Sequence, residues 1–183
     1  MILGIKNFEI SGVKLFHIKS HEDNRGEFSE VYLTKLDHPE FKIKYGQENE
    51  SISNFGVFRG MHLQKGIHSQ SKLIRVIKGK VIDVICDLRK SSPSFKKIIF
   101  IELNPNQLLF MPKGLAHGFL SLDEGTILNY KCDNFYNQSS ESGFNLFKSR
   151  IEIDFPLEID DLIMSDKDKS LPDLDNSYIY QEL

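Results

Sequence analysis

The chain has 183 residues, 40% of them hydrophobic, and a formal net charge of -3 at pH 7. This length favours one domain, residues 1–183, with a substantial core, and no window is long and apolar enough for a transmembrane helix. The N-terminus lacks the cleavage site of a signal peptide, and Cys86 and Cys132 have no metal-ligand spacing. We therefore predict a cytoplasmic protein with reduced thiols and no membrane partner.

Runs of β-branched or alternating residues recur along the chain with turn residues between them. In chain order they predict strands at 13–19, 28–33 and 47–53, a strand that carries Arg59 and His62, and strands at 73–77, 81–86, 97–103, 108–111, 116–120 and 126–132. The runs at 73–77 and 81–86, joined through Lys78-Gly79-Lys80, are predicted to form a hairpin. The regular spacing is typical of an antiparallel sandwich or barrel, so the predicted fold class is all-β.

The connections between these strands predict turns and little helix. Asp23-Asn-Arg-Gly predicts a turn in which Gly26 takes a positive φ. Residues 36–41, which include Pro39, predict a loop or a short helical turn. After Tyr136 the strand pattern fades into polar residues, and a short helix is expected around residues 160–164.

The residues from Arg59 to Lys80 form a basic stretch, with six Lys or Arg and no acidic residue. A local positive field in an acidic chain indicates a small anionic ligand, and it argues against nucleic acid as a partner. On charge alone, a basic sheet edge that resists aggregation is the simpler interpretation.

A further pattern, Pro112-x-Gly-x-x-His117, resembles the second motif of cupin-type jelly rolls, in which the next strand points its histidine into the barrel. Metal-binding cupins supply two histidines and a glutamate from their first motif. Here that place reads His62-Leu-Gln64, and Lys72 stands where an acidic ligand is expected. Because a lysine ammonium repels a cation, we predict no metal site and expect acid–base chemistry instead.

Several segments, in order along nearly the whole chain, share one resemblance. They are Asp23-x-Arg-Gly-x-Phe-x-Glu, Gln47-x-Asn-x-Ser-x-Ser, Phe58-Arg-Gly-Met-His-Leu-Gln, Gln70-Ser-Lys-Leu-Ile-Arg-Val, Gly79-Lys-Val-Ile-Asp-Val, Asp87-Leu-Arg, Pro112-Lys-Gly-Leu-Ala-His-Gly-Phe, Tyr130-Lys-Cys and Ser165-Asp-Lys-Asp. Together they resemble the dTDP-4-dehydrorhamnose 3,5-epimerase family. The resemblance implies a cupin-like antiparallel jelly roll with a short C-terminal helical segment, no cofactor, a nucleotide-diphosphate-linked 4-keto sugar as ligand, and a homodimer.

The same resemblance implies roles for the matching residues. His62 resembles the general base, Lys72 the cation that stabilises enolate charge, and Tyr130 the general acid on the opposite face. Asp168 resembles the carboxylate partner of the base, with Asp166 as the competing candidate. The resemblance also implies substrate contacts. At the sugar these are Arg59 and His117, with Asp83 behind His117, and at the diphosphate they are Arg25, Gln47 and Asn49. Glu141 is a further substrate contact, and Phe28 and Glu30 belong to the nucleotide end of the site, which in this family can come from the neighbouring subunit.

Inversion beside a ketone needs these types of residue. A 4-keto sugar has an acidified C–H on each side of its carbonyl, so a base on one face and an acid on the other can invert a carbon without a redox cofactor. Histidine titrates near the working pH. A fixed cation aimed at the carbonyl oxygen stabilises the enolate more than the substrate, and arginine suits diphosphate oxygens.

Some positions depart from the family pattern. Leu63 replaces an aromatic residue after the histidine, and Phe135 replaces one of two tyrosines. These departures leave open an enzyme that inverts C3 alone, and an epimerase of a GDP-linked deoxy or heptose sugar. A non-catalytic sugar-nucleotide-binding cupin is the alternative of another class, and the joint presence of an acid and a base argues against it. The expected setting is the supply of a sugar for a surface polysaccharide, such as capsule or lipopolysaccharide.

Overall fold

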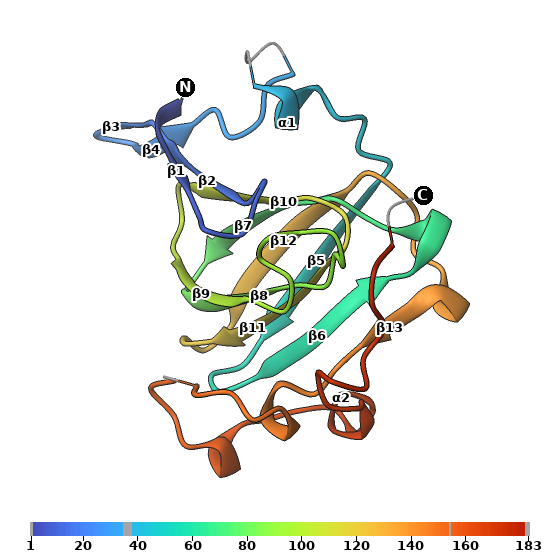
Figure 1. Cartoon of the computed structure of the whole chain (residues 1–183). Helices are drawn as coiled ribbons and strands as arrows, with labels where there is room; N and C mark the ends of the chain where they lie inside the picture. The colour runs from blue at the N-terminus through green and yellow to red at the C-terminus, as the bar shows by residue number, and fades with distance from the viewer. Residues whose placement is uncertain (1, 35–37, 154, 182–183) are drawn as a thin grey trace.

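The computed structural model describes residues 2–34, 38–153 and 155–181. Two antiparallel sheets make up most of it (Figure 1), a six-stranded sheet in the order β1-β2-β10-β7-β12-β5 and a five-stranded sheet in the order β13-β6-β11-β8-β9. Strands β3 and β4 form a separate two-stranded hairpin. The predicted all-β architecture is confirmed.

The elements have the following bounds. The strands are β1 (Ile2–Asn7), β2 (Lys14–Ile18), β3 (Ser20–Asp23), β4 (Gly26–Ser29), β5 (Gln47–Ser53), β6 (Phe58–Gln64), β7 (Lys72–Lys78), β8 (Val81–Asp87), β9 (Ile98–Leu103), β10 (Gln107–Met111), β11 (Leu115–Ser121), β12 (Thr126–Cys132) and β13 (Glu141–Gly143). The α-helices are α1 (Pro39–Lys42) and α2 (Asp166–Ser170), and single 3-10 turns form η1 (Gly66–His68), η2 (Gln138–Ser140), η3 (Leu146–Lys148) and η4 (Ile159–Asp161).

Three predicted elements differ from the structure by more than one residue at an end. The strand predicted at 28–33 ends at Ser29, because Val31 and Tyr32 leave the hairpin and pack against the outer face of the six-stranded sheet. The helix expected at 160–164 is only the single turn η4, and α2 begins after it. Of the helical turn predicted at 36–41, residues 36 and 37 lie outside the described residues, and α1 begins at Pro39.

The predicted hairpin between 73–77 and 81–86 is wrong. Strand β7 pairs with β10 and β12 in one sheet, whereas β8 pairs with β9 and β11 in the other. The turn through Gly79 is therefore a corner that carries the chain from one sheet to the other. Gly79 has a φ of +81°, and a Cβ there would lie 2.5 Å from Thr126 Oγ1, so the corner needs glycine for its conformation and for space.

The two sheets pack face to face around an apolar core that includes Ile74, Ile85 and Phe119. Residues 31–32 and 41–45 cover the outer face of the six-stranded sheet, and residues 144–153 and 155–180 cover the outer face of the five-stranded sheet. Because the C-terminal segment lies against β6, it brings α2 beside that strand (Figure 1).

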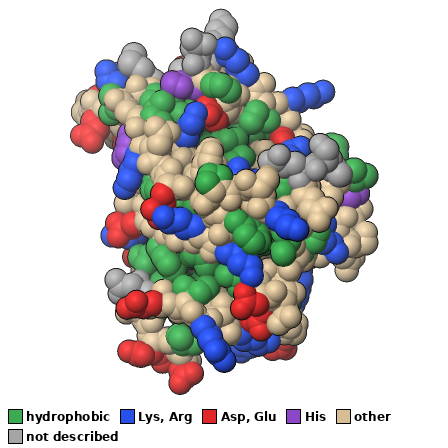
Figure 2. Space-filling view, viewed as in Figure 1, with side chains coloured by type: hydrophobic (Ala, Val, Ile, Leu, Met, Phe, Trp, Pro, Cys, Tyr) green, Lys and Arg blue, Asp and Glu red, His purple; other side chains and the backbone are tan. Residues whose placement is uncertain are grey.

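The outside of the molecule carries charges of both signs, interspersed over the face shown in Figure 2. None of the helices formed by the described residues is long and apolar enough to cross a membrane. Both cysteines, Cys86 and Cys132, are unpaired and buried.

Candidate active site

A cavity of about 540 Å³ opens between the two sheets. Its lining comes from β5, β6, β7, β11, β12 and α2, and from the residues just before β6 and α2: Ser51, Val57, Phe58, Arg59, His62, Lys72, His117, Phe119, Tyr130, Ile163, Met164, Ser165, Lys167 and Asp168. A smaller cavity of about 120 Å³ shares His62, Lys72 and Tyr130 with it. The structure thus brings all four predicted catalytic residues to one cavity, together with Arg59 and His117.

Strand pairing explains how these side chains come to lie on two facing walls. His62 on β6 and His117 on β11 are direct cross-strand partners, so both side chains leave the same face of the five-stranded sheet. On the six-stranded sheet, Lys72 of β7 pairs with Cys132 of β12, two residues beyond Tyr130. Since residues two apart on a strand share a face, Lys72 and Tyr130 line the same wall, opposite the histidines.

His62 and Asp168 form a hydrogen-bonded pair at the edge of the cavity. His62 Nε2 lies 2.7 Å from Asp168 Oδ1, and the backbone N–H of Gly60 donates to Asp168 Oδ2 at 3.2 Å. Burial alone would raise the pKa of Asp168, but hydrogen bonds from His62, Gly60 and Ser165 outweigh it, and the pKa is lowered. An ionised carboxylate only accepts hydrogen bonds, so Nε2 of a neutral His62 carries the hydrogen and Nδ1 keeps a lone pair for a proton.

The competing carboxylate, Asp166, is exposed at the start of α2. The structure therefore pairs His62 with Asp168. Gly60 has a φ of +125°, and a Cβ there would lie 2.6 Å from the Cα of Gly118, so only glycine lets β6 approach β11 this closely beside the pair.

His117 and Asp83 form a second pair deeper in the protein. Asp83 comes from β8, its Oδ2 lies 2.7 Å from His117 Nε2, and its side chain is completely buried. Burial raises the pKa of Asp83, although His117 and Lys72 attract its charge and oppose the shift. Within the described residues Asp83 Oδ1 has no hydrogen-bond partner, which adds to the energetic cost of ionising this carboxyl group.

Lys72 and Tyr130 form the opposite wall, with Lys72 Nζ 5.7 Å from the centre of the Tyr130 ring. Burial lowers the pKa of Lys72, although nearby acidic groups oppose the shift. Burial also raises the pKa of Tyr130, although Arg59 opposes that shift. A tyrosine held in its protonated form can donate a proton, and a partly desolvated ammonium is well placed to stabilise an anion that forms beside it.

The predicted polar contacts line both cavities and come from both sheets. Gln47, Asn49 and Glu141 all line the smaller cavity, and Gln47 Nε2 donates to Asn49 Oδ1 at 3.0 Å. Arg59 lines the larger one, where its Nε donates to Ser53 Oγ at 3.1 Å. Gln47 and Asn49 thus offer hydrogen-bond donors from the six-stranded sheet, whereas Arg59 offers a cation and Glu141 a carboxylate from the five-stranded sheet.

Our sequence analysis missed a charged cluster beside His62. Glu141 accepts a hydrogen bond from Tyr136 Oη at 2.8 Å and forms an ion pair with Lys167 Nζ at 2.6 Å. Lys167 lines the larger cavity, and Tyr136 lines the smaller one. The signal for Lys167 was present in Ser165-Asp-Lys-Asp, which we used only for its aspartates.

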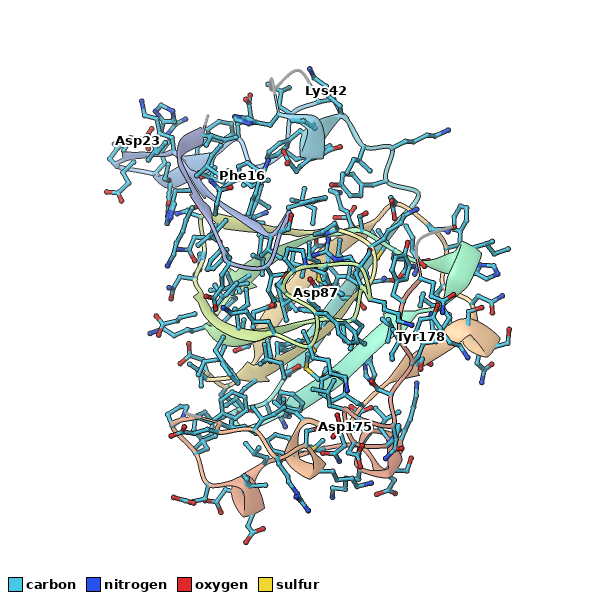
Figure 3. All side chains as sticks on the ribbon, viewed as in Figure 1. Phe16, Asp23, Lys42, Asp87, Asp175 and Tyr178 are labelled. Carbon is cyan, nitrogen blue, oxygen red and sulfur yellow. The ribbon has the colours of Figure 1, made fainter. Side chains whose placement is uncertain are left out.

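Three predicted substrate contacts, Arg25, Phe28 and Glu30, do not line the cavity of their own chain. Arg25 and Phe28 belong to the β3–β4 hairpin, which projects at the end of the molecule opposite α2 (Figure 1), where Figure 3 labels Asp23. Arg25 Nη2 lies 2.5 Å from Asp23 Oδ2, and the Phe28 side chain is 69% exposed.

The position of a metal ligand in cupins is occupied here by a residue that binds the backbone. Gln64, which stands in the place of a cupin ligand, accepts a hydrogen bond from the backbone N–H of Asn137 at 3.0 Å. Among residues 2–34, 38–153 and 155–181, no group of three or more His, Cys, Asp or Glu side chains could hold a metal ion.

Comparison with known proteins gives one consistent result. The family model described as dTDP-4-dehydrorhamnose 3,5-epimerase matches residues 7–176. The dTDP-4-dehydrorhamnose 3,5-epimerase of Methanothermobacter thermautotrophicus is 37% identical over 175 residues, which cover 93% of this chain and 94% of that protein.

Solved structures agree with the sequence comparison. The crystal structure of dTDP-4-dehydrorhamnose 3,5-epimerase from Sulfolobus tokodaii has a TM-score of 0.87 at 35% identity, covering 98% of this chain and 99% of that one. A dTDP-6-deoxy-D-glucose-3,5-epimerase from Legionella pneumophila, in complex with dTDP-4-keto-L-rhamnose, has a TM-score of 0.87 at 30% identity, covering 98% of each chain. The predicted cupin-like fold is confirmed, and this chain is an isomerase that belongs to the dTDP-4-dehydrorhamnose 3,5-epimerase family.

Proposed function

We propose that this protein inverts both carbons that flank the ketone of a dTDP-linked 4-keto-6-deoxyhexose, as a dTDP-4-dehydrorhamnose 3,5-epimerase. The observation that carries the proposal is the placement of the His62–Asp168 pair and of Tyr130 with Lys72 on facing walls of one cavity. A volume of about 540 Å³ suits a ligand the size of a sugar nucleotide fragment. The ligand of the Legionella pneumophila neighbour supports the same substrate class.

The first step is removal of a proton from the carbon next to the ketone. His62 Nδ1 accepts this proton, and Asp168, which accepts the Nε2 hydrogen, stabilises the imidazolium that forms. The C–H electron pair moves toward the carbonyl, and negative charge collects on the carbonyl oxygen as an enolate. Lys72, which lies beside Tyr130 on the opposite wall, stabilises that charge in its protonated form.

The second step returns a proton to the same carbon from the other side. Tyr130 donates from its hydroxyl while the enolate electron pair reforms the C–H bond, and the ketone is restored with the configuration inverted. Solvent then takes the proton from His62 and reprotonates Tyr130, so the cycle is balanced without an oxidant or a reductant. Repetition at the second carbon completes the 3,5-epimerisation.

We propose that the nucleotide diphosphate extends from the sugar along Arg59, Gln47 and Asn49. Since Arg25 and Phe28 lie on a projecting hairpin, they can contact this ligand only if a second copy of the chain supplies them, and we propose a homodimer on that basis. Light scattering at micromolar concentration tests the dimer, and a monomer would contradict it.

The missing hydroxyl of Phe135 is one of the departures that left open an enzyme that inverts C3 alone. The Phe135 side chain is 65% exposed and is not among the residues that line either cavity, so this substitution gives no reason to prefer the narrower chemistry. We further propose that the chain acts as one domain in the cytoplasm, where its buried thiols stay reduced, and that its product serves a surface polysaccharide.

A thermal-shift panel with dTDP, GDP and UDP tests the nucleotide, because a ligand that binds the folded state raises the unfolding temperature by mass action. We expect dTDP to give the largest shift. Proton NMR of a dTDP-linked 4-keto-6-deoxyhexose incubated with the protein tests the reaction itself. Binding of dTDP without any epimerisation would favour the non-catalytic sugar-nucleotide-binding protein.

A further inference from the structure

We propose that Asn145 is a positioning residue, which sets the relative placement of the two halves of the His62–Asp168 pair. The inference rests on the proposed function for its meaning in catalysis, and on hydrogen bonds for its geometry. Asn145 is buried, with 5% of its surface exposed, and it lies outside both cavities, so it acts through other residues rather than on a ligand.

The helix that carries Asp168 is too short to hold its own position. Helix α2 has five residues, and a helix of this length is not stable without contacts from the rest of the protein. Its N-terminal end is capped by Ser165, whose Oγ accepts from the backbone N–H of Asp168 at 3.1 Å. The carboxylate itself also accepts hydrogen bonds from Gly60 and His62, and the helix has a further attachment toward its other end.

Asn145 supplies that attachment with both hydrogens of its amide. Nδ2 donates to the backbone carbonyl oxygens of Asp168 and Lys169, each at 3.3 Å. The backbone N–H of Asn145 donates to the carbonyl oxygen of Pro172 at 2.7 Å, just beyond the helix. Three bonds from one buried residue thus fix the segment that presents the carboxylate.

The same residue is tied to the strand beside His62. Asn145 follows β13, in which Gly143 is the cross-strand partner of His62. Its Oδ1 accepts from the backbone N–H groups of Phe147 at 2.9 Å and Lys148 at 3.2 Å, and so caps η3. One side chain therefore connects the frame that holds the base to the helix that holds its carboxylate partner, two residues separated by 106 positions in sequence.

Two substitutions separate the attachment of α2 from the cap of η3. Asn145→Ser and Asn145→Asp both keep an oxygen that can cap η3, and both remove the amide hydrogens that bind α2. Asn137→Ser is the matched control, because Asn137 caps η2 through the same kind of contact and makes no bond to α2. All three proteins are tested as full chains.

The first readout is kinetic. Because a small misplacement of a catalytic group costs up to about 100-fold in rate, we expect kcat to fall about 10- to 100-fold in both Asn145 variants, with dTDP affinity within about twofold of wild type. The second readout is the 15N NMR signal of the His62 ring. We expect the Nε2–H tautomer, which Asp168 holds in the wild type, to give way to a mixture of tautomers in the variants.

These outcomes decide the proposal. Wild-type kcat and an unchanged His62 signal in a folded Asn145 variant would overturn it, as would an equal effect in Asn137→Ser. Failure of both Asn145 variants to fold would make Asn145 a folding residue and would also overturn it. If the wild type itself proves inactive on 4-keto sugars, the proposed function fails, while the His62 tautomer still tests the positioning role.

Discussion

The two histidine–aspartate pairs of this protein have the same nitrogen–oxygen distance in different surroundings. Both close at 2.7 Å, yet the His62 side chain is 30% exposed to the cavity and that of His117 only 7%. Asp168 is held by hydrogen bonds that lower its pKa, whereas burial raises the pKa of Asp83. Under the proposed mechanism, this difference means that the His–Asp distance alone does not decide which histidine acts as the base. A base also needs access to substrate and a partner that stays ionised.

Replacing each aspartate by asparagine gives the largest expected contrast between the pairs. We expect Asp168→Asn to lower kcat by about 10²- to 10⁴-fold, because His62 loses both the fixed tautomer and the charge that stabilises its protonated form. Asp83→Asn should cost less than about tenfold, since His117 is not expected to transfer a proton. Rates come from proton NMR of the sugar nucleotide, and equal losses in the two variants would remove the distinction.

The wall opposite the histidines should show the next largest effect. Lys72→Met removes the cation that faces the developing enolate, and we expect kcat to fall about 10²- to 10³-fold. Lys131→Met is the control, since Lys131 Nζ is paired with Glu48 at 2.7 Å and lies outside both cavities. Equal rates for Lys72→Met and the wild type would contradict the role of Lys72.

Arg59→Ala tests substrate binding separately from the proton-transfer steps that the two histidine–aspartate variants test. A charge-assisted contact to a phosphate is typically worth about 1.5–3 kcal/mol, so we expect dTDP affinity to fall by roughly 10- to 150-fold. Titration calorimetry with dTDP measures this directly. Arg150, an exposed residue that lines neither of the two active-site cavities, provides the matched Arg→Ala control. Unchanged affinity in Arg59→Ala would place the diphosphate elsewhere.

The smallest expected effect is a difference in how stability depends on pH. Because the folded-state pKa of Asp168 is lowered, its contribution is present above the unfolded pKa of about 3.9 and is lost as pH falls through the folded pKa. Because that of Asp83 is raised, its contribution is present below about 3.9 and is lost as pH rises through the folded pKa. Unfolding temperatures are measured between pH 3 and 7. The difference between wild type and Asp168→Asn should grow as pH rises, and the difference between wild type and Asp83→Asn should grow as pH falls. If both differences changed with pH in the same direction, the contrast between the two aspartates would be contradicted.

Strand positions could be predicted from the sequence where one face of a strand is buried and the other is not. The alternation from Gln47 to Ser53 predicted β5 with its observed bounds, and the run from Thr126 to Cys132 did the same for β12. Sheet membership could not be predicted in this way. Two β-branched runs joined by a glycine turn, as at Gly79, occur both in hairpins and in corners between two sheets. Only the long-range pairing of each run distinguishes the two cases.

Site residues could be predicted from the sequence where they lie close together within one motif. His62 and Lys72 stand close in sequence, but the carboxylate that bonds His62 lies 106 residues later, and only the family resemblance connected them. The ion pair of Glu141 with Lys167 and the hydrogen bonds of Asn145 join segments whose local sequence gives no sign of the contact. Such contacts depend on how the C-terminal segment packs on β6, which no local pattern contains.

The central claim is that His62 removes the proton and Tyr130 delivers one from the opposite face. Proton NMR of a dTDP-linked 4-keto-6-deoxyhexose in heavy water follows both events, with wild type, His62→Ala and Tyr130→Phe compared at equal concentration. We expect His62→Ala to introduce no deuterium at either carbon, and Tyr130→Phe to exchange deuterium while inverting poorly. Undiminished exchange in His62→Ala would show that another group is the base and would contradict this account.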